Sequence, residues 1–81
     1  MIQARVEFML VDLDLAMTFM DVAGASRLED TKHRNHKNAR KAYDTALNLS
    51  EKLKPDAGQR RVIEAKLARL KTRLEAAGKQ F

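Results

Sequence analysis

Pro55 is the only proline in this chain, and it separates two long segments whose apolar residues recur at helical spacing. A proline cannot continue the hydrogen-bond ladder of a preceding helix, and the residue before it avoids the helical region of backbone conformation. Asp56 is a candidate N-cap, with Gln59 three residues later at the spacing of a capping box. We therefore predict a helix over residues 33–53, a break at Lys54-Pro55-Asp56, and a further helix over residues 56–77.

Each of these two helices carries one apolar stripe. The stripe before the break is rich in alanine: Ala39, Ala42, Tyr43, Ala46, Leu49 and Leu53. The stripe after the break repeats in alternating steps of four and three residues: Ile63, Leu67, Leu70, Leu74 and Ala77. Because the link between the helices is short, we expect them to be antiparallel neighbours and the firmest hairpin of the fold. Gly78 is expected at the C′ position that ends the second of them.

The first thirty residues give a less regular pattern. Residues 11–15 alternate apolar and acidic side chains as a strand does, whereas the residues from Leu15 onward follow helical spacing. No partner strand occurs elsewhere, so we predict a helix over residues 12–28, with a start near residue 4 as the alternative. Residues 1–11 are then an N-terminal segment that is helical, extended or disordered. Two apolar rows lie on the predicted helix: Leu13, Met17 and Met20 in one, and Leu15, Phe19 and Val22 in the other.

Residues 29–36 hold no large apolar side chain. We expect them to be a connection between the first two helices, or a connection plus a solvated first helical turn, with Asp30 or Thr31 as the candidate N-cap. A chain of 81 residues forms one domain at most. Glycine, proline and aromatic residues are scarce, which disfavours a β-sandwich or barrel. The predicted fold is therefore a single all-α domain over residues 1–81, a three-helix antiparallel bundle built from a helical hairpin and a long apolar first helix.

Ala39, Tyr43 and Ala46 stand at the spacing of a small residue, an aromatic four positions later and an alanine three after that. In this the segment resembles the second helix of a tetratricopeptide repeat. The order of the predicted elements also resembles the three-helix microtubule-interacting-and-trafficking domain. Both families are peptide- or protein-binding scaffolds, so the resemblance implies a binding module, although it implies no particular ligand-contacting residue.

The composition excludes several classes of chemistry. The chain has no cysteine, which rules out disulfides, thiolate catalysis and cysteine-based zinc sites. The most apolar stretch, residues 8–25, is interrupted by Asp12, Asp14 and Asp21, which are costly in a membrane. It also lacks the basic flank of a signal peptide. No phosphate-binding loop or nucleophile motif is present. We expect a cytoplasmic protein that is not an enzyme. We expect it to bind no cofactor, no membrane and no small-molecule substrate.

Two pairs of polar residues are the remaining candidates for chemistry. His33 and His36 share a face if they are helical, but Lys32, Arg34 and Lys37 surround them and repel a cation. We therefore expect no metal there. Asp12 and Asp14 point in different directions on a helix and are poorly placed for general acid–base catalysis.

Charge is distributed unevenly along the chain. Residues 1–30 carry six acidic and two basic side chains, whereas residues 31–81 carry fourteen basic and five acidic ones. Six basic residues of the second and third helices are candidates for one phosphate-binding patch: Lys37, Arg40, Lys41, Lys66, Arg69 and Arg73. No aromatic residue interleaves with them to stack on bases. Nucleic-acid binding is therefore the alternative function.

The leading hypothesis is a non-enzymatic protein–protein interaction module. The two apolar rows of the first helix exceed what one bundle contact needs, and a monomer rarely leaves a large contiguous apolar patch exposed. We predict that this helix binds a protein partner or a second copy of the chain. The candidate interface residues are Phe8, Leu13, Met17, Phe19 and Met20.

Overall fold

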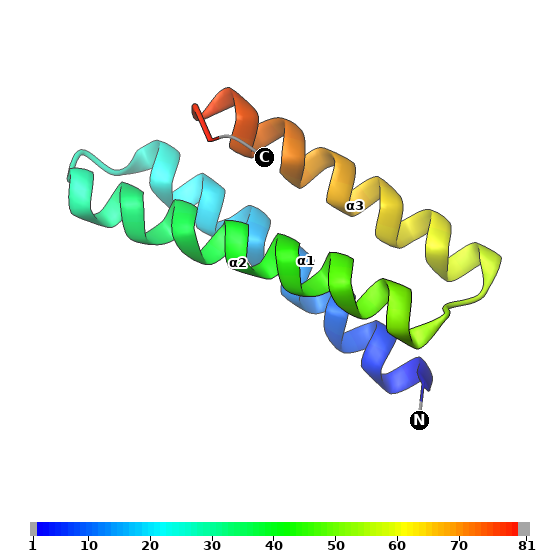
Figure 1. Cartoon of the computed structure of the whole chain (residues 1–81). Helices are drawn as coiled ribbons and strands as arrows, with labels where there is room; N and C mark the ends of the chain where they lie inside the picture. The colour runs from blue at the N-terminus through cyan, green and yellow to red at the C-terminus, as the bar shows by residue number, and fades with distance from the viewer. Residues whose placement is uncertain (1, 80–81) are drawn as a thin grey trace.

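The computed structural model describes residues 2–79 of the chain, and the side chains of residues 4–79. Three helices make up the fold: α1 (Ile2–Ala25), α2 (Glu29–Leu53) and α3 (Ala57–Ala76). Each helix runs antiparallel to the one before it, so α1 and α3 point the same way (Figure 1). The all-α three-helix prediction is thus confirmed. Met1, in the predicted N-terminal segment, and residues 80–81 lie outside the described residues.

The predicted break between α2 and α3 is confirmed in its details. Lys54 adopts the left-handed conformation, with φ 48° and ψ 60°, which ends α2 directly before Pro55. The Asp56 carboxylate accepts a hydrogen bond from the Gln59 backbone N–H at 2.8 Å. The Gln59 side chain accepts one in return from the Asp56 N–H at 3.1 Å. This capping box satisfies two backbone donors that the start of α3 would otherwise leave unpaired.

The end of α3 follows the prediction for Gly78. This residue has φ +85°, a conformation that costs glycine little. The Lys79 N–H donates to the Leu74 carbonyl and the Gly78 N–H to the Glu75 carbonyl, both at 2.9 Å. These two bonds form a Schellman motif, which closes the last turn of the helix.

Three of the sequence-based helix boundaries were wrong. Helix α1 spans residues 2–25 and not 12–28, because the alternation at residues 11–15 is the overlap of two apolar stripes on one helix. The alternative start near residue 4 lies within two residues of the observed one. Helix α2 begins at Glu29, four residues before the predicted start, and its N-cap is Leu28 in place of Asp30 or Thr31. Its first turn carries Glu29 and Asp30, whose charges favour the positive end of the helix dipole.

The turn between α1 and α2 is closed by Ser26. Its hydroxyl oxygen accepts a hydrogen bond from the Leu28 N–H at 3.1 Å. A local serine bond of this kind competes with helix formation, and so stops the chain from joining α1 and α2 into one helix.

The core runs along the contact of all three helices. Its largest fully buried side chains are Val6, Leu13, Ile63, Leu70 and Leu74. The burial of Leu67, Leu70 and Leu74 is as predicted, whereas Leu49 remains 36% exposed at the edge. No polar or charged side chain is buried among the described residues.

The tightest pair of helices is α1 and α2, not the predicted pair of α2 and α3. Alanine explains this difference, because its small side chain lets two helix backbones approach closely. Ala16 and Ala23 of α1 and Ala39 and Ala46 of α2 are all buried. The sequence predicted that the alanine row of α2 packs against α3. In the structure this row packs against α1 as well.

Candidate functional site

Helix α1 carries two apolar stripes, each spaced in alternating steps of three and four residues. The inner stripe packs into the core and consists of Val6, Met9, Leu13, Ala16, Met20 and Ala23. The outer stripe lies on the opposite side and consists of Ala4, Phe8, Val11, Leu15, Thr18 and Val22, all classed as exposed. Its four large members expose 74%, 61%, 48% and 44% of their surface, from Phe8 to Val22. The exposed apolar side chains of α1 thus lie in one row, interrupted by the polar Thr18.

This arrangement revises the candidate interface inferred from the sequence. Phe8 is exposed as expected, but Leu13 and Met20 are 1% and 4% exposed and belong to the chain's own core. Met17 and Phe19 are half-buried and pack against that core. The reason is that one stripe continues along α1 from Val6 to Ala23, and Leu13 and Met20 fall on it. The spacing of that stripe was visible in the sequence, but its alanines gave little apolar signal.

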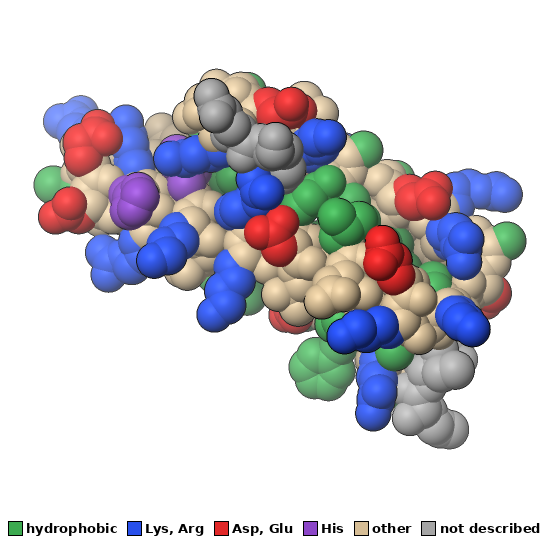
Figure 2. All heavy atoms as spheres, viewed as in Figure 1, with side chains coloured by type: hydrophobic (Ala, Val, Ile, Leu, Met, Phe, Trp, Pro, Cys, Tyr) green, Lys and Arg blue, Asp and Glu red, His purple; other side chains and the backbone are tan. Residues whose placement is uncertain are grey.

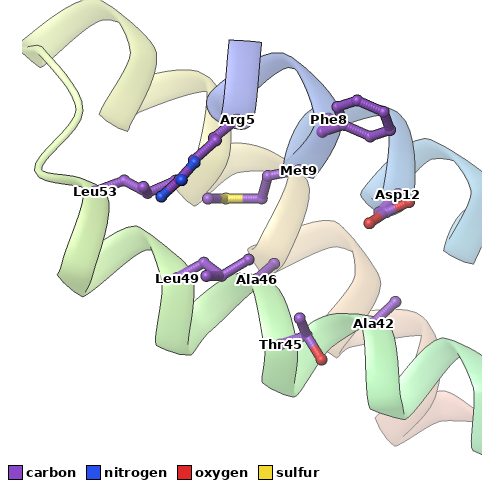
Figure 3. A pocket seen from close by; sticks show the side chains of 9 residues that line it. All are labelled: Arg5, Phe8, Met9, Asp12, Ala42, Thr45, Ala46, Leu49 and Leu53. Atoms are coloured by element: carbon purple, nitrogen blue, oxygen red, sulfur yellow. The ribbon is translucent and has the colours of Figure 1, made fainter. Parts of the chain in front are cut away.

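A groove of about 190 Å³ lies between the N-terminal half of α1 and the C-terminal half of α2, and Phe8 is the member of the outer stripe that lines it. Met9, Ala46 and Leu49 line it, and Figure 3 shows the Met9 side chain directed toward the two α2 residues. In the same view Arg5 reaches from α1 toward Leu53. The groove therefore widens the apolar surface of α1 onto α2.

A second hollow, of about 280 Å³, lies on the outer stripe itself. Its lining residues are Ala4, Glu7, Phe8 and Val11. These stand at positions i, i+3, i+4 and i+7, the four positions that form the hole for an incoming side chain when two helices pack as a coiled coil. The outer stripe thus has a shape suited to a facing helix.

Acidic residues of α1 on the side of α3 are already paired. Lys66 of α3 contacts the Asp14 carboxylate, and the Arg73 guanidinium lies 2.7 Å from the Asp21 carboxylate. Arg73 also donates to the Met17 carbonyl at 3.4 Å. The carboxylates are mostly exposed, so each pair contributes about 0–1 kcal/mol to stability. Their main effect is to neutralise this flank of α1.

These pairs divide the basic patch predicted from the sequence. Lys66 and Arg73 face α1, whereas the Arg40 side chain pairs with Asp44 on α2, at 3.1 Å. Lys37, Lys41 and Arg69 are exposed. Figure 2 shows basic side chains spread over the visible face with acidic ones between them. Three of the six residues, Arg40, Lys66 and Arg73, thus form ion pairs within the chain.

His33 and His36 line a hollow of about 420 Å³ where the α1–α2 turn meets the end of α3. Partial burial lowers the pKa of His36, and the charges of Lys79, His33 and Lys32 lower it further, against the opposing charge of Glu29. Across the part of the chain that the structure describes, no three His, Cys, Asp or Glu side chains are grouped to hold a metal ion. The absence of a metal here stays a prediction.

Comparison with protein-family models, with curated proteins and with solved structures found no match in any of the three. The resemblance to tetratricopeptide-repeat and microtubule-interacting-and-trafficking domains therefore stays an expectation from Ala39, Tyr43 and Ala46. Within residues 2–79, none of the helices has the length and apolar character needed to cross a membrane.

Proposed function

We propose that this chain is a non-enzymatic protein-interaction module whose binding surface is the outer stripe of α1. The observation that carries the proposal is the exposure of Phe8, Val11, Leu15 and Val22 in one row at coiled-coil spacing. Solvent exposure of such a row is unfavourable by about 25 cal/mol for each Å² of apolar surface, and a partner that covers it recovers this energy. Neither cofactor nor small-molecule substrate enters the proposal.

The charge distribution supports this function over the alternative of nucleic-acid binding. A phosphate-binding surface needs basic side chains that converge on one face and remain available to phosphates. Two of the six candidates, Lys66 and Arg73, instead hold acidic residues of α1. The apolar row has no comparable internal partner.

The experiment compares two identical changes at exposed valines. Val11→Glu places a charge in the outer stripe, whereas Val62→Glu places it on α3, where the valine is 45% exposed. We expect both variants to fold, as judged by circular dichroism. Val11→Glu should lose self-association in sedimentation and lose any protein that the wild-type chain retains from an extract of its host. Val62→Glu should behave as wild type. Equal binding by Val11→Glu and wild type would contradict the proposal.

A further inference from the structure

The outer stripe has the repeat of a coiled-coil seam. From Ala4 to Val22 its members follow steps of four, three, four, three and four residues. An average step of 3.5 residues keeps a row of side chains facing one partner helix along its whole length. The stripe spans most of α1, whose 24 residues extend over roughly 36 Å at about 1.5 Å per residue. A facing helix of similar length therefore fits this surface.

The sizes of the side chains favour one orientation of a self-pairing helix. If α1 packs antiparallel against α1 of a second copy, with the two-fold axis at the height of residue 13 along the helix, Phe8 faces Thr18 and Ala4 faces Val22. Val11 then faces Leu15. Each bulky side chain meets a smaller one, as close packing requires. In a parallel pair Phe8 would meet Phe8, and Ala4 would meet Ala4, which leaves one layer overfilled and the next one empty.

The register is set by two further features. Residue 13 lies at the middle of α1 (Ile2–Ala25), so this register pairs the helix over nearly its full length. It also places Thr18 of the second copy over the hollow lined by Ala4, Glu7, Phe8 and Val11. A shift by one heptad in either direction would shorten the contact, and it would place Val11 or Ala25 of the second copy over that hollow.

Acidic side chains flank the outer stripe, and a second copy would bring like charges close to one another. On the α3 side, Asp14 would approach Asp14 of the other copy and Asp21 would approach its Glu7, but Lys66 and Arg73 neutralise Asp14 and Asp21 within each copy. On the α2 side, Asp12 would meet its own counterpart across the two-fold axis. Two like charges there weaken the pairing without abolishing it, because both carboxylates are exposed to water.

The available area indicates a dimer of modest affinity. Residues 4–25 of α1 form a strip roughly 33 Å long and about 10 Å wide, or roughly 330 Å² for each copy, whereas a standard interface buries about 800 Å² for each partner. Leu49 and the groove beside it add apolar surface from α2. Two such strips give roughly 660 Å² in total, below the roughly 1,000 Å² that a stable interface buries, so the contact is expected to be weak and transient.

We infer that the partner of the outer stripe is a second copy of this chain, bound through an antiparallel, two-fold symmetric α1–α1 contact. This inference rests on the proposed function and specifies its partner. In such an isologous interface the same surface is used on both copies, so the contact covers the outer stripe of each copy at once.

Single cysteine variants test the orientation directly, because the natural chain has no cysteine. The variants are Ala4→Cys, Asp12→Cys and Val22→Cys, each treated with a short bis-maleimide crosslinker after circular dichroism has shown it to be folded. In the inferred dimer the two copies of residue 12 are adjacent. The two copies of residue 4 lie roughly 27 Å apart, at about 1.5 Å for each of the residues between them.

The expected result is a covalent dimer for Asp12→Cys alone and for a mixture of Ala4→Cys with Val22→Cys. Neither Ala4→Cys nor Val22→Cys should crosslink by itself, and adding Val11→Glu to Asp12→Cys should remove the product. Crosslinking of Ala4→Cys alone would indicate a parallel pair and overturn the inference. A lack of product in every sample would also overturn it, while the proposed function would still be decided separately, by whether Val11→Glu loses a protein retained from the host extract.

Discussion

At the scale of single residues, the ends of α3 are fixed by local chemistry. Asp56 and Gln59 cap its start, and Gly78 closes its end with a positive φ that a side chain would strain. Each device acts through neighbours within five residues in the sequence. For this reason the boundaries of α3 could be predicted almost to the residue without knowledge of the rest of the fold.

Replacing Asp56 with alanine removes the acceptor for the Gln59 N–H. We expect the free energy of unfolding to fall by about 1 kcal/mol, the usual cost of losing an N-cap side chain. Chemical denaturation monitored by circular dichroism measures this change. Asp44→Ala is the matched control, because Asp44 forms an exposed ion pair with Arg40, and the loss of such a pair should cost about 0.5 kcal/mol or less. An equal loss in both variants would show that the cap contributes nothing specific.

His36 is expected to make stability depend on pH. Partial burial lowers the pKa of His36 in the folded chain, and the positive charges of Lys79, His33 and Lys32 lower it further. The negative charge of Glu29 raises this pKa but does not offset the other effects. The unfolded chain, with a pKa of about 6.5 at this residue, therefore takes up the proton more readily. The stabilisation is complete above about pH 6.5 and is lost as the pH falls through the lower, folded pKa.

The measurement is the midpoint of thermal unfolding between about pH 7.5 and about pH 5.5, a range that brackets the histidine pKa. The midpoint should fall toward acid in the wild type, and His36→Gln should reduce that fall. His33→Gln, at an exposed position, is the control and should retain most of it. The same acid dependence in wild type and His36→Gln would contradict this account of His36.

At the scale of helices, α1 is distinguished by having two apolar stripes where α3 has one. Sequence periodicity identified apolar rows on this helix but divided them incorrectly, because the two stripes overlap and together obscure the period of either. Tertiary contacts decide which stripe is buried, and a sequence pattern alone contains no such information. The start of α2 was missed for a related reason, since residues 29–36 are helical without contributing an apolar stripe.

The division of α1 into an inner and an outer stripe predicts opposite effects for two neighbouring leucines. Leu13 is 1% exposed, so Leu13→Glu buries a carboxylate without a partner and should unfold the domain. Leu15 is 48% exposed, so Leu15→Glu should leave the domain folded, with a loss of about 1 kcal/mol or less. Far-ultraviolet circular dichroism and thermal unfolding in dilute solution, where dimers dissociate, measure both effects. Loss of the fold in Leu15→Glu would place the outer stripe in the core.

At the scale of the whole molecule, the three helices form an elongated body with extents of 40 × 20 × 16 Å. Such a thin bundle has one central seam, and α1 contributes to it with a single stripe. The outer stripe therefore lies along the length of the body, where a partner of similar length reaches all of it. On the face that Figure 2 shows, basic side chains are spread over the surface with acidic ones between them.

The central claim is that α1 binds a second copy through its outer stripe, and nuclear magnetic resonance on dilution tests it most directly. Backbone amide signals of the isotopically labelled wild-type chain are followed from high to low concentration. We predict concentration-dependent shifts at Phe8, Val11, Leu15 and Val22, and none at Val62 of α3. Spectra that do not change with concentration, or changes confined to α2 and α3, would contradict the claim.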